Sequence, residues 1–315
     1  AYATDYTNAS RTLFMNLDSL EWDTAMLKML SAEGLHLPQL RSSSAHFGES
    51  HFAGIFAQPV PIHAMIGDSH AAAFGERCLS RGTAKATLGT GSSILMNTGG
   101  QRAESEHGMV ATVCWSAGER VDYALEGIIV SCGSTITWLR DQMGLFAESH
   151  ESDALAESVP DNGGVCLIPA FAGLGAPYWK MEQTALISGL TFSTGKAHVV
   201  RAGLESIGYQ VKDVIDAMEM DSGIALTRLQ VDGGLTKSSF VMPHLANVLT
   251  VPVAAIELTE ASAFGAALLA GLGAGIYSGI DEIAAIPYTS IDYHPQKQTG
   301  AQEEYKMWKK TVRTL

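Results

Sequence analysis

Residues 82–99 read GTAKATLGTGSSILMNTG, and this stretch gives the clearest local signal of the fold. Apolar and β-branched residues on both sides of Gly89-Thr90-Gly91-Ser92 predict two strands joined by a glycine turn. Glycines let backbone N–H groups approach a phosphate, and a Thr or Ser hydroxyl adds a donor. A hairpin turn rich in Gly and Ser is more often only a turn, so the motif alone leaves both interpretations open.

Downstream of this hairpin, predicted strands alternate with predicted helices. The helix from Gly195 to Asp221 is the clearest, because its apolar residues recur close to every 3.6 positions and Gly223 follows as a stop signal. The pattern also predicts strands at 112–115, 120–124, 164–169, 229–232 and 251–256, and helices at 136–143, 239–249 and 261–272. This alternation indicates α/β layers, and the hairpins make the sheet mixed rather than purely parallel.

Upstream, the sequence predicts an amphipathic helix over 19–30 and a buried strand over 63–67 that ends at Asp68. A small-residue helix is expected directly after it. A carboxylate at the end of a strand can accept a hydroxyl proton during phosphoryl transfer, but it can equally cap the following helix. For the neighbouring His70, a structural role is the better interpretation.

A second glycine turn, Asp232-Gly233-Gly234, lies between a predicted strand and a predicted helix. Such a turn can point backbone amides at an anion or a nucleotide, or it can be a tight connection capped by the Asp. The sequence contains no GxxxxGK[ST] and no GxGxxG that opens a helix, so neither a P-loop nor a dinucleotide-binding fold is expected.

The composition limits the classes of partner. With 20 Lys+Arg against 33 Asp+Glu, the net charge is −13, and such a chain would be repelled by nucleic acid and by anionic membranes. The four cysteines form no CxxC pair, which fits a reducing compartment better than a disulfide framework. No signal-peptide pattern or membrane-spanning run is present. We therefore expect a cytoplasmic protein.

Several separate segments together resemble the FGGY carbohydrate kinases, and the glycerol kinases among them most closely. The segments are IGDSHAA (66–72), KATLGTGS (85–92), YALEG (123–127), PAFAGLGAPYW (169–179) and VDGG (231–234), in the family's order. The resemblance implies an actin/hexokinase-like (ribonuclease H-like) α/β fold, with mixed sheets, flanking helices and a nucleotide cleft between two domains. It also implies ATP and Mg²⁺ as cofactors, and a small polyol or sugar as the phosphate acceptor.

The resemblance assigns roles to individual residues. Asp68 would be the general base toward the substrate hydroxyl, with Ser69 and Ser93 beside the substrate. The nucleotide site would comprise Gly89 and Thr90 at the β- and γ-phosphates, Gly133 lining the site, Gly233 and Gly234 near the adenosine and α-phosphate, and Ser238 where the family has an Asn. No residue of this chain is assigned to a metal.

Departures from the family qualify these roles, and two of them bear on the domain limits and on the substrate. The family's first phosphate hairpin, with the Asp that helps to hold Mg²⁺, has no counterpart, so we expect an incomplete first domain over 1–78. A second, nucleotide-side domain would follow over 79–285, and an extension over 286–315. A non-catalytic remnant that keeps only the nucleotide-side domain is therefore an alternative to an active kinase.

The second departure concerns the substrate. Glycerol kinases have Gln and Phe at the positions of Ser69 and Ser93. Exchanging Phe for Ser removes an apolar wall and adds a hydroxyl, which favours a longer or more polar substrate such as a tetritol or pentulose (erythritol or xylulose). Glycerol remains the leading substrate by overall similarity. Dimers and tetramers are common in similar kinases, and the sequence leaves the oligomeric state open.

Overall fold

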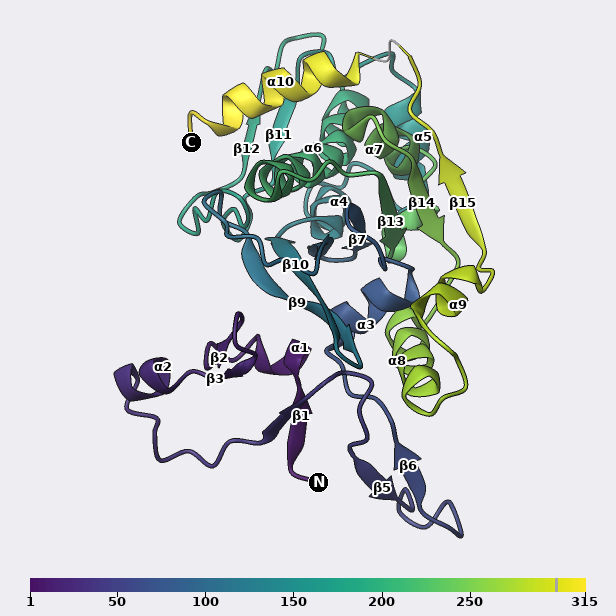
Figure 1. Ribbon diagram of the computed structural model, residues 1–315. Coiled ribbons are helices and arrows are strands. Elements are labelled where there is room, and N and C mark those ends of the chain that lie inside the picture. The colour runs from purple at the N-terminus through teal and green to yellow at the C-terminus, as the bar shows by residue number, and fades with distance from the viewer. Residues whose placement is uncertain (298–299) are drawn as a thin grey trace.

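A seven-stranded mixed sheet forms the centre of the molecule in the computed structural model, which describes residues 1–297 and 300–315 (Figure 1). Its strand order is β15-β14-β13-β7-β8-β10-β9. The strands are β7 (Thr83–Leu88), β8 (Ser92–Gly99), β9 (Val110–Ala117), β10 (Arg120–Ile129), β13 (Arg228–Asp232), β14 (Val253–Ile256) and β15 (Ser290–Tyr293). β13 runs parallel to β7 and β14, whereas the other pairs are antiparallel. The predicted mixed α/β architecture is confirmed.

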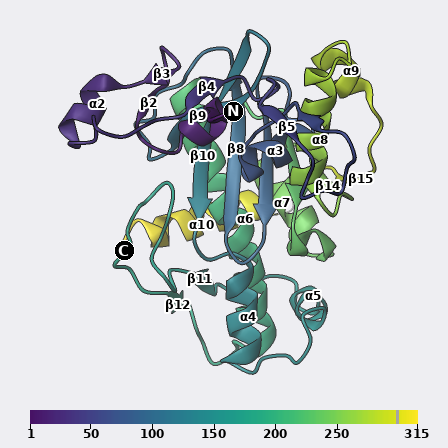
Figure 2. The same cartoon turned by 90° about the horizontal axis from the view of Figure 1, so that it is seen from below.

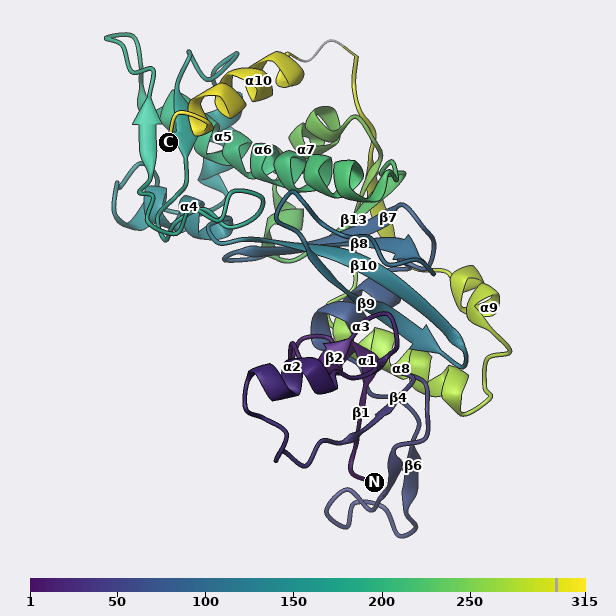
Figure 3. The same cartoon turned by 60° about the vertical axis from the view of Figure 1, so that its left-hand side comes forward.

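One face of the sheet is covered by α6 (Lys196–Ser222) and α7 (Val241–Leu249), as Figure 3 shows. α6 forms as predicted and ends at Gly223, whose φ of 64° is the left-handed conformation that favours glycine. α4 (Gly133–Asp141), α5 (Glu151–Glu157) and the small sheet of β11 (Cys166–Ile168) and β12 (Leu186–Ser188) extend this layer. α10 (Ala301–Val312) packs outside α6 and α7.

The opposite face carries α3 (Asp68–Gly75) and α8 (Ala261–Gly273), with α9 (Ile280–Ala285) beyond them. Alternation along β8 divides the two cores: Ile94 and Met96 pack toward α6, and Leu95 packs with Phe74 of α3. α3 and α8 approach so closely that a Cβ on Gly75 would lie 2.6 Å from the carbonyl oxygen of Ala261. Small residues at this crossing therefore allow α3 and α8 to approach closely.

The N-terminal segment forms a separate arm beside the central sheet (Figures 1 and 2). Its elements are β1 (Ala3–Asp5), α1 (Tyr6–Ala9), β2 (Met15–Asn16), β3 (Glu21–Trp22), α2 (Thr24–Met29), β4 (Gln39–Arg41), β5 (Gly48–Ser50) and β6 (Val60–Ile62). β1 pairs in parallel with β4, and β5 pairs antiparallel with β6. Among the described residues, no helix is both long and apolar enough to cross a bilayer.

Two predicted elements of this arm are wrong in extent or kind. The helix expected over 19–30 starts only at Thr24, because the Asp23 carboxylate caps it by accepting from the N–H groups of Ala25 and Met26. The strand expected over 63–67 does not form. That segment is half-exposed and takes a backbone bond from Met65 N–H to Ser43 O (3.0 Å), so its apolar run is an extended connection.

Candidate active site

Asp68 is the first residue of α3, and the structure fixes the backbone on both sides of it. The N-cap is Gly67, with φ −62° and ψ 145°, so the alternative of Asp68 as the helix cap is wrong. The Gly67 N–H donates to Thr7 Oγ1 (2.8 Å), and Thr7 donates to the buried carboxylate of Asp5 (2.7 Å). Ser262 of α8 donates to the Asp68 carbonyl (2.9 Å). The Asp68 side chain itself is exposed.

Ser69 and Ser93, predicted to share the substrate site, are in contact. Their hydroxyl oxygens lie 3.1 Å apart, and Ser93 donates to Glu126 Oε1 (3.1 Å). Arg11 forms an ion pair with the other oxygen of Glu126 (2.7 Å). Because Ser93 follows the Gly89–Ser92 turn directly, these contacts place Asp68 at the end of the sheet where that turn lies.

The sequence analysis gave Arg11 and Glu126 no role. The signal for Glu126 was present, because a Glu inside the apolar strand YALEGII must be buried and therefore needs a partner. Nothing in the local sequence identified that partner, since Arg11 lies more than a hundred positions away.

Three of the predicted nucleotide glycines pack backbone against backbone. The Gly133 N–H donates to the Gly89 carbonyl (2.9 Å), and a Cβ on Gly133 would lie only 2.7 Å from that oxygen. Gly233 has φ 95°, and its Cβ would lie 2.6 Å from the Leu88 carbonyl. Only glycine fits both positions, so the two turns and the start of α4 meet closely.

A cavity of ≈ 510 Å³ lies where these segments meet. Gly89, Thr90, Gly133, Gly234 and Ser238 all line it, and Gly233 adjoins it in sequence. Asp68, Ser69 and Ser93 do not line this cavity. The predicted nucleotide residues are thus brought together in one place, and the predicted substrate residues form a second group.

Other residues complete the cavity. Ile136, Leu204 and Leu235 line it with apolar side chains, and Lys237 contributes a cation. The Ser238 hydroxyl is already bonded within the protein: it donates to Asp153 Oδ1 (2.8 Å) and accepts from the Val241 N–H (2.9 Å). Ser238 therefore also fixes the start of α7.

Buried titratable groups surround α3. Burial, with the nearby cations Arg11 and Lys85, lowers the pKa of His70 to about 3. His70 Nε2 lies 3.2 Å from Thr112 Oγ1, so the histidine is neutral and structural, as expected.

At the other end of α3, burial and then the Asp232 carboxylate raise the pKa of Glu76 well above its ordinary value. Within residues 1–297 and 300–315, no group of three or more His, Cys, Asp or Glu side chains is arranged to hold a metal ion.

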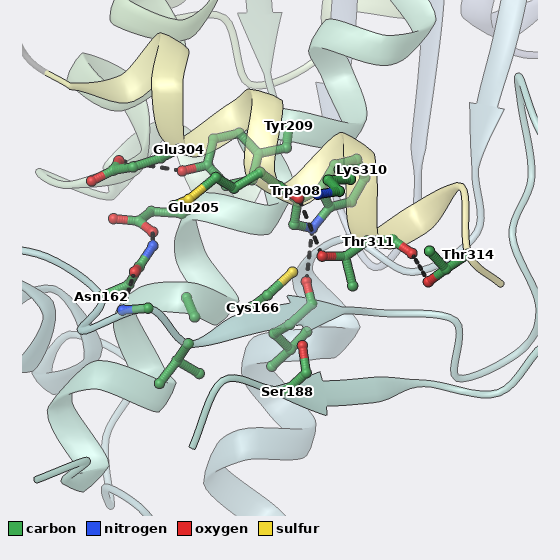
Figure 4. A pocket seen from close by; sticks show the side chains of 15 residues that line it. Asn162, Cys166, Ser188, Glu205, Tyr209, Glu304, Trp308, Lys310, Thr311 and Thr314 are labelled. Atoms are coloured by element: carbon green, nitrogen blue, oxygen red, sulfur yellow. Dashed lines mark hydrogen bonds between the residues drawn. The ribbon is translucent and has the colours of Figure 1, made fainter. Parts of the chain in front are cut away.

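A second cavity, of ≈ 440 Å³, lies between α6, α10, β11 and β12 (Figure 4). None of the predicted site residues lines it. Its central carboxylate is Glu205, which is fully buried and accepts from Asn162 Nδ2 (2.8 Å) and Arg201 Nε (2.7 Å). Its acidic groups are thus bonded within the protein, and this cavity is not part of the candidate active site.

Glu205 predicts a pH dependence of stability. Burial raises its pKa from 4.5 to about 7, although Asn162 and Arg201 favour the charged form. Between pH 4.5 and about pH 7, Glu205 is protonated in the folded state and ionised in the unfolded state. The free energy of unfolding should therefore fall as pH rises through this range, by up to about 3 kcal/mol. Thermal unfolding of wild type and Glu205→Gln from about pH 5 to about pH 8 measures this, because the variant lacks that proton equilibrium. Exposed Glu303→Gln is the control; parallel pH curves for wild type and Glu205→Gln would contradict the prediction.

Comparison with known proteins gives matches along nearly the whole chain. The model for the C-terminal domain of the FGGY family of carbohydrate kinases matches residues 84–274, and that for the N-terminal domain matches residues 1–75. Glycerol kinases from Bacillus cereus and Stenotrophomonas maltophilia are 45% and 44% identical over 313 residues, which is 99% of this chain and 63% of each relative. The chain thus spans under two thirds of the length of these relatives.

Solved structures agree. The Plasmodium falciparum glycerol kinase with ADP has a TM-score of 0.91 at 33% identity, over 99% of this chain and 63% of that one. A xylulose kinase from Lactobacillus acidophilus has a TM-score of 0.90 at 20% identity, over 99% and 64%, and shows likeness of fold alone. With both family models matched in chain order, the protein belongs to the FGGY family of carbohydrate kinases.

Proposed function

We propose that the protein is an ATP-dependent kinase that transfers the γ-phosphate to a hydroxyl group of glycerol or a related small polyol. One observation carries the proposal: the Asp68 segment meets the strand that follows the Gly89–Ser92 turn, through Ser69 and Ser93 at 3.1 Å, while that turn lines the cavity shared with Gly133 and Gly234. The proposed proton acceptor, Asp68, and the glycine-lined cavity thus lie at the same end of the sheet.

The residues around the cavity fit a nucleotide. Its ≈ 510 Å³ lies within the size range of small-ligand sites, about 300–1,000 Å³. Gly133 and Gly233 let backbone segments approach closely, and the Lys237 side chain supplies positive charge in a chain whose net charge is negative. When bound, ATP would supply the phosphoryl group, and Mg²⁺ would neutralise charge on its phosphates.

In this proposal each residue has a distinct task. Asp68 accepts the proton of the attacking hydroxyl, and its exposed carboxylate is accessible to a substrate. Ser69 and Ser93 orient the substrate's other hydroxyls. The Arg11–Glu126 pair holds Ser93 in place, and the bonds of Gly67 and Ser262 hold the backbone at Asp68, so the proton acceptor is positioned before the substrate arrives.

The direct test is a substrate panel. The full-length gene product, with ATP and Mg²⁺, is assayed for ADP release with glycerol, erythritol, xylulose and an acceptor-free blank. Release that depends on one of these acceptors supports the proposal. ATP binding without transfer to any acceptor would favour the alternative of a module that keeps only the nucleotide-side domain. The domain limits at 78/79 and 285/286 remain predictions, as do the cytoplasmic location and the assembly state.

A tetritol or pentulose is the second candidate substrate, because Ser69 and Ser93 present two hydroxyls to each other where glycerol kinases have Gln and Phe. We expect Ser93→Phe to lower kcat/KM for erythritol and xylulose by about tenfold or more relative to glycerol, since the ring fills the space of the extra hydroxymethyl group. Steady-state kinetics on the three substrates measures the change. Ser93→Ala is the control, because it removes the bond to Glu126 without adding bulk. Equal losses on all three substrates in Ser93→Phe would contradict a role in specificity.

A further inference from the structure

Arg77 occupies an unusual position at the far end of α3 from Asp68. It lies just after the helix and has φ 67°, which is the left-handed conformation. Glycine is the usual residue in this conformation at the end of a helix. The Cys78 N–H bonds back to the Ala73 carbonyl (2.8 Å), which closes the helix end around it. A non-glycine residue held in this conformation is a departure from the local rule, and such departures concentrate at ligand-binding sites.

The Arg77 guanidinium is buried without a charged partner. The residue is 8% exposed, and Nη1 donates to the Gly75 carbonyl (2.8 Å). Nε and Nη2 have no hydrogen-bond partner among the residues that the structure describes, and no carboxylate pairs with the side chain there. The guanidinium carbon instead lies 5.3 Å from the centre of the Phe264 ring and 5.7 Å from the centre of the Tyr288 ring. Leaving two charged donors unpaired in the interior is costly, so an anionic partner would be strongly favoured.

Arg77 lines a broad cavity of ≈ 890 Å³, together with residues from the start of β10 and from α9. Two more arginines line it. Arg120 is neutralised by a two-bond pair with Asp122 (2.9 and 3.0 Å), whereas exposed Arg81 makes no ion pair with any described residue. Asp281 is the remaining charged residue in the lining, and it lies near Arg120.

We propose that this cavity binds a small molecule through a phosphate group, held by the guanidinium groups of Arg77 and Arg81. Planar guanidinium donors match phosphate oxygens in pairs, and a dianion would balance the two unpaired cations. Nε and Nη2 of Arg77 are closed to solvent, and the Tyr288 ring beside the guanidinium lines the cavity, so in this proposal that ring turns aside on binding. Ser80 and Gln230, which also line the cavity, are donors for the rest of the molecule.

The site is separate from the proposed nucleotide cavity, because the two share no lining residue. They lie at opposite ends of the sheet's strands: one adjoins the Gly89–Ser92 turn, and the other adjoins Gly99 at the end of β8. Failure of the kinase proposal would therefore leave this one standing, and the reverse also holds.

The test is a calorimetric titration of the full-length gene product with inorganic phosphate and with glycerol 3-phosphate. Arg77→Gly removes the cation and suits the left-handed backbone, so it should fold. Arg81→Gln alters an exposed side chain. Lys306→Gln, an equal charge change on an exposed lysine of α10, is the matched control. We expect each arginine substitution to weaken phosphate binding at least tenfold, which is about 1.4 kcal/mol, and the lysine substitution to have no effect.

The two titrants identify the source of the phosphate. Tighter binding of glycerol 3-phosphate assigns the cavity to an organic phosphate, and equal binding assigns it to free phosphate; both support the proposal when the arginine variants lose it. If phosphate bound in the nucleotide cavity instead, neither arginine substitution would change its affinity. Equal phosphate affinity in wild type and all variants would overturn the proposal. So would the absence of saturable binding at a phosphate concentration of about 10 mM, because a site with a millimolar Kd would be filled at that concentration.

Discussion

Asn in place of Asp68 should lower kcat of the full-length gene product by about 10²–10⁴-fold, while ATP binding and thermal stability stay near wild type. The amide has nearly the shape of the carboxylate but cannot accept the proton that the attacking hydroxyl must lose. Stability should be unaffected because the Asp68 side chain is exposed and is not the cap of α3. Coupled ADP-release kinetics, nucleotide titration and thermal unfolding measure the three quantities.

Ser69→Ala is the matched control for this experiment. It changes the adjacent residue and removes the contact with Ser93, but it leaves the carboxylate in place. We expect it to change KM for the substrate more than kcat. If Asp68→Asn kept kcat within a few-fold of wild type in a folded, ATP-binding protein, the proton would have to be accepted elsewhere, and the role proposed for Asp68 would be wrong.

Local patterns were sufficient for most of the central sheet and its helices. The hairpin at 82–99 and the helix ending at Gly223 form as predicted, because a glycine turn and a 3.6-residue apolar period act over short distances. The failures lie in the N-terminal arm. The run at 63–67 is as apolar as a strand, but a strand needs a neighbouring strand with which to form repeated backbone hydrogen bonds. Here the Met65 N–H donates to the single carbonyl of Ser43, and the Gly67 N–H donates to a side chain, that of Thr7.

The same distinction applies to the candidate site. The glycines could be identified, because close backbone approach and positive φ exclude other residues, as at Gly233. Local patterns could not show that Gly89, Gly133 and Gly234 line one cavity. Predicting this needed the resemblance to a family, and observing it needed the fold. The Arg11–Glu126 pair and the unpaired Arg77 were out of reach, because each depends on contacts between segments far apart in the chain.

The second large effect concerns the crossing of α3 and α8. We expect Gly265→Ala to destabilise the protein by about 3 kcal/mol or more and to lower its melting temperature by about 5 °C or more. A Cβ at Gly265 would collide with the Ala71 carbonyl group, lying 2.7 Å from its carbon, and would lie 2.9 Å from the Gly75 nitrogen. Backbone atoms of a packed helix cannot move aside as a side chain can. This cost exceeds the gain in helix propensity, about 1 kcal/mol, that alanine normally brings.

The consequence extends beyond stability, because α8 also holds the start of α3 through Ser262 and the Asp68 carbonyl. If α3 must shift to admit the methyl group, Asp68 shifts with it, so any folded Gly265→Ala protein should lose kcat more than nucleotide affinity. Gly279→Ala is the control: that glycine precedes α9, has extended backbone with φ 174°, and would have no atom within 4 Å of its Cβ. Equal melting temperatures for the two variants would mean that α3 and α8 are not in close backbone contact, and the positioning of Asp68 by this crossing would then be untenable.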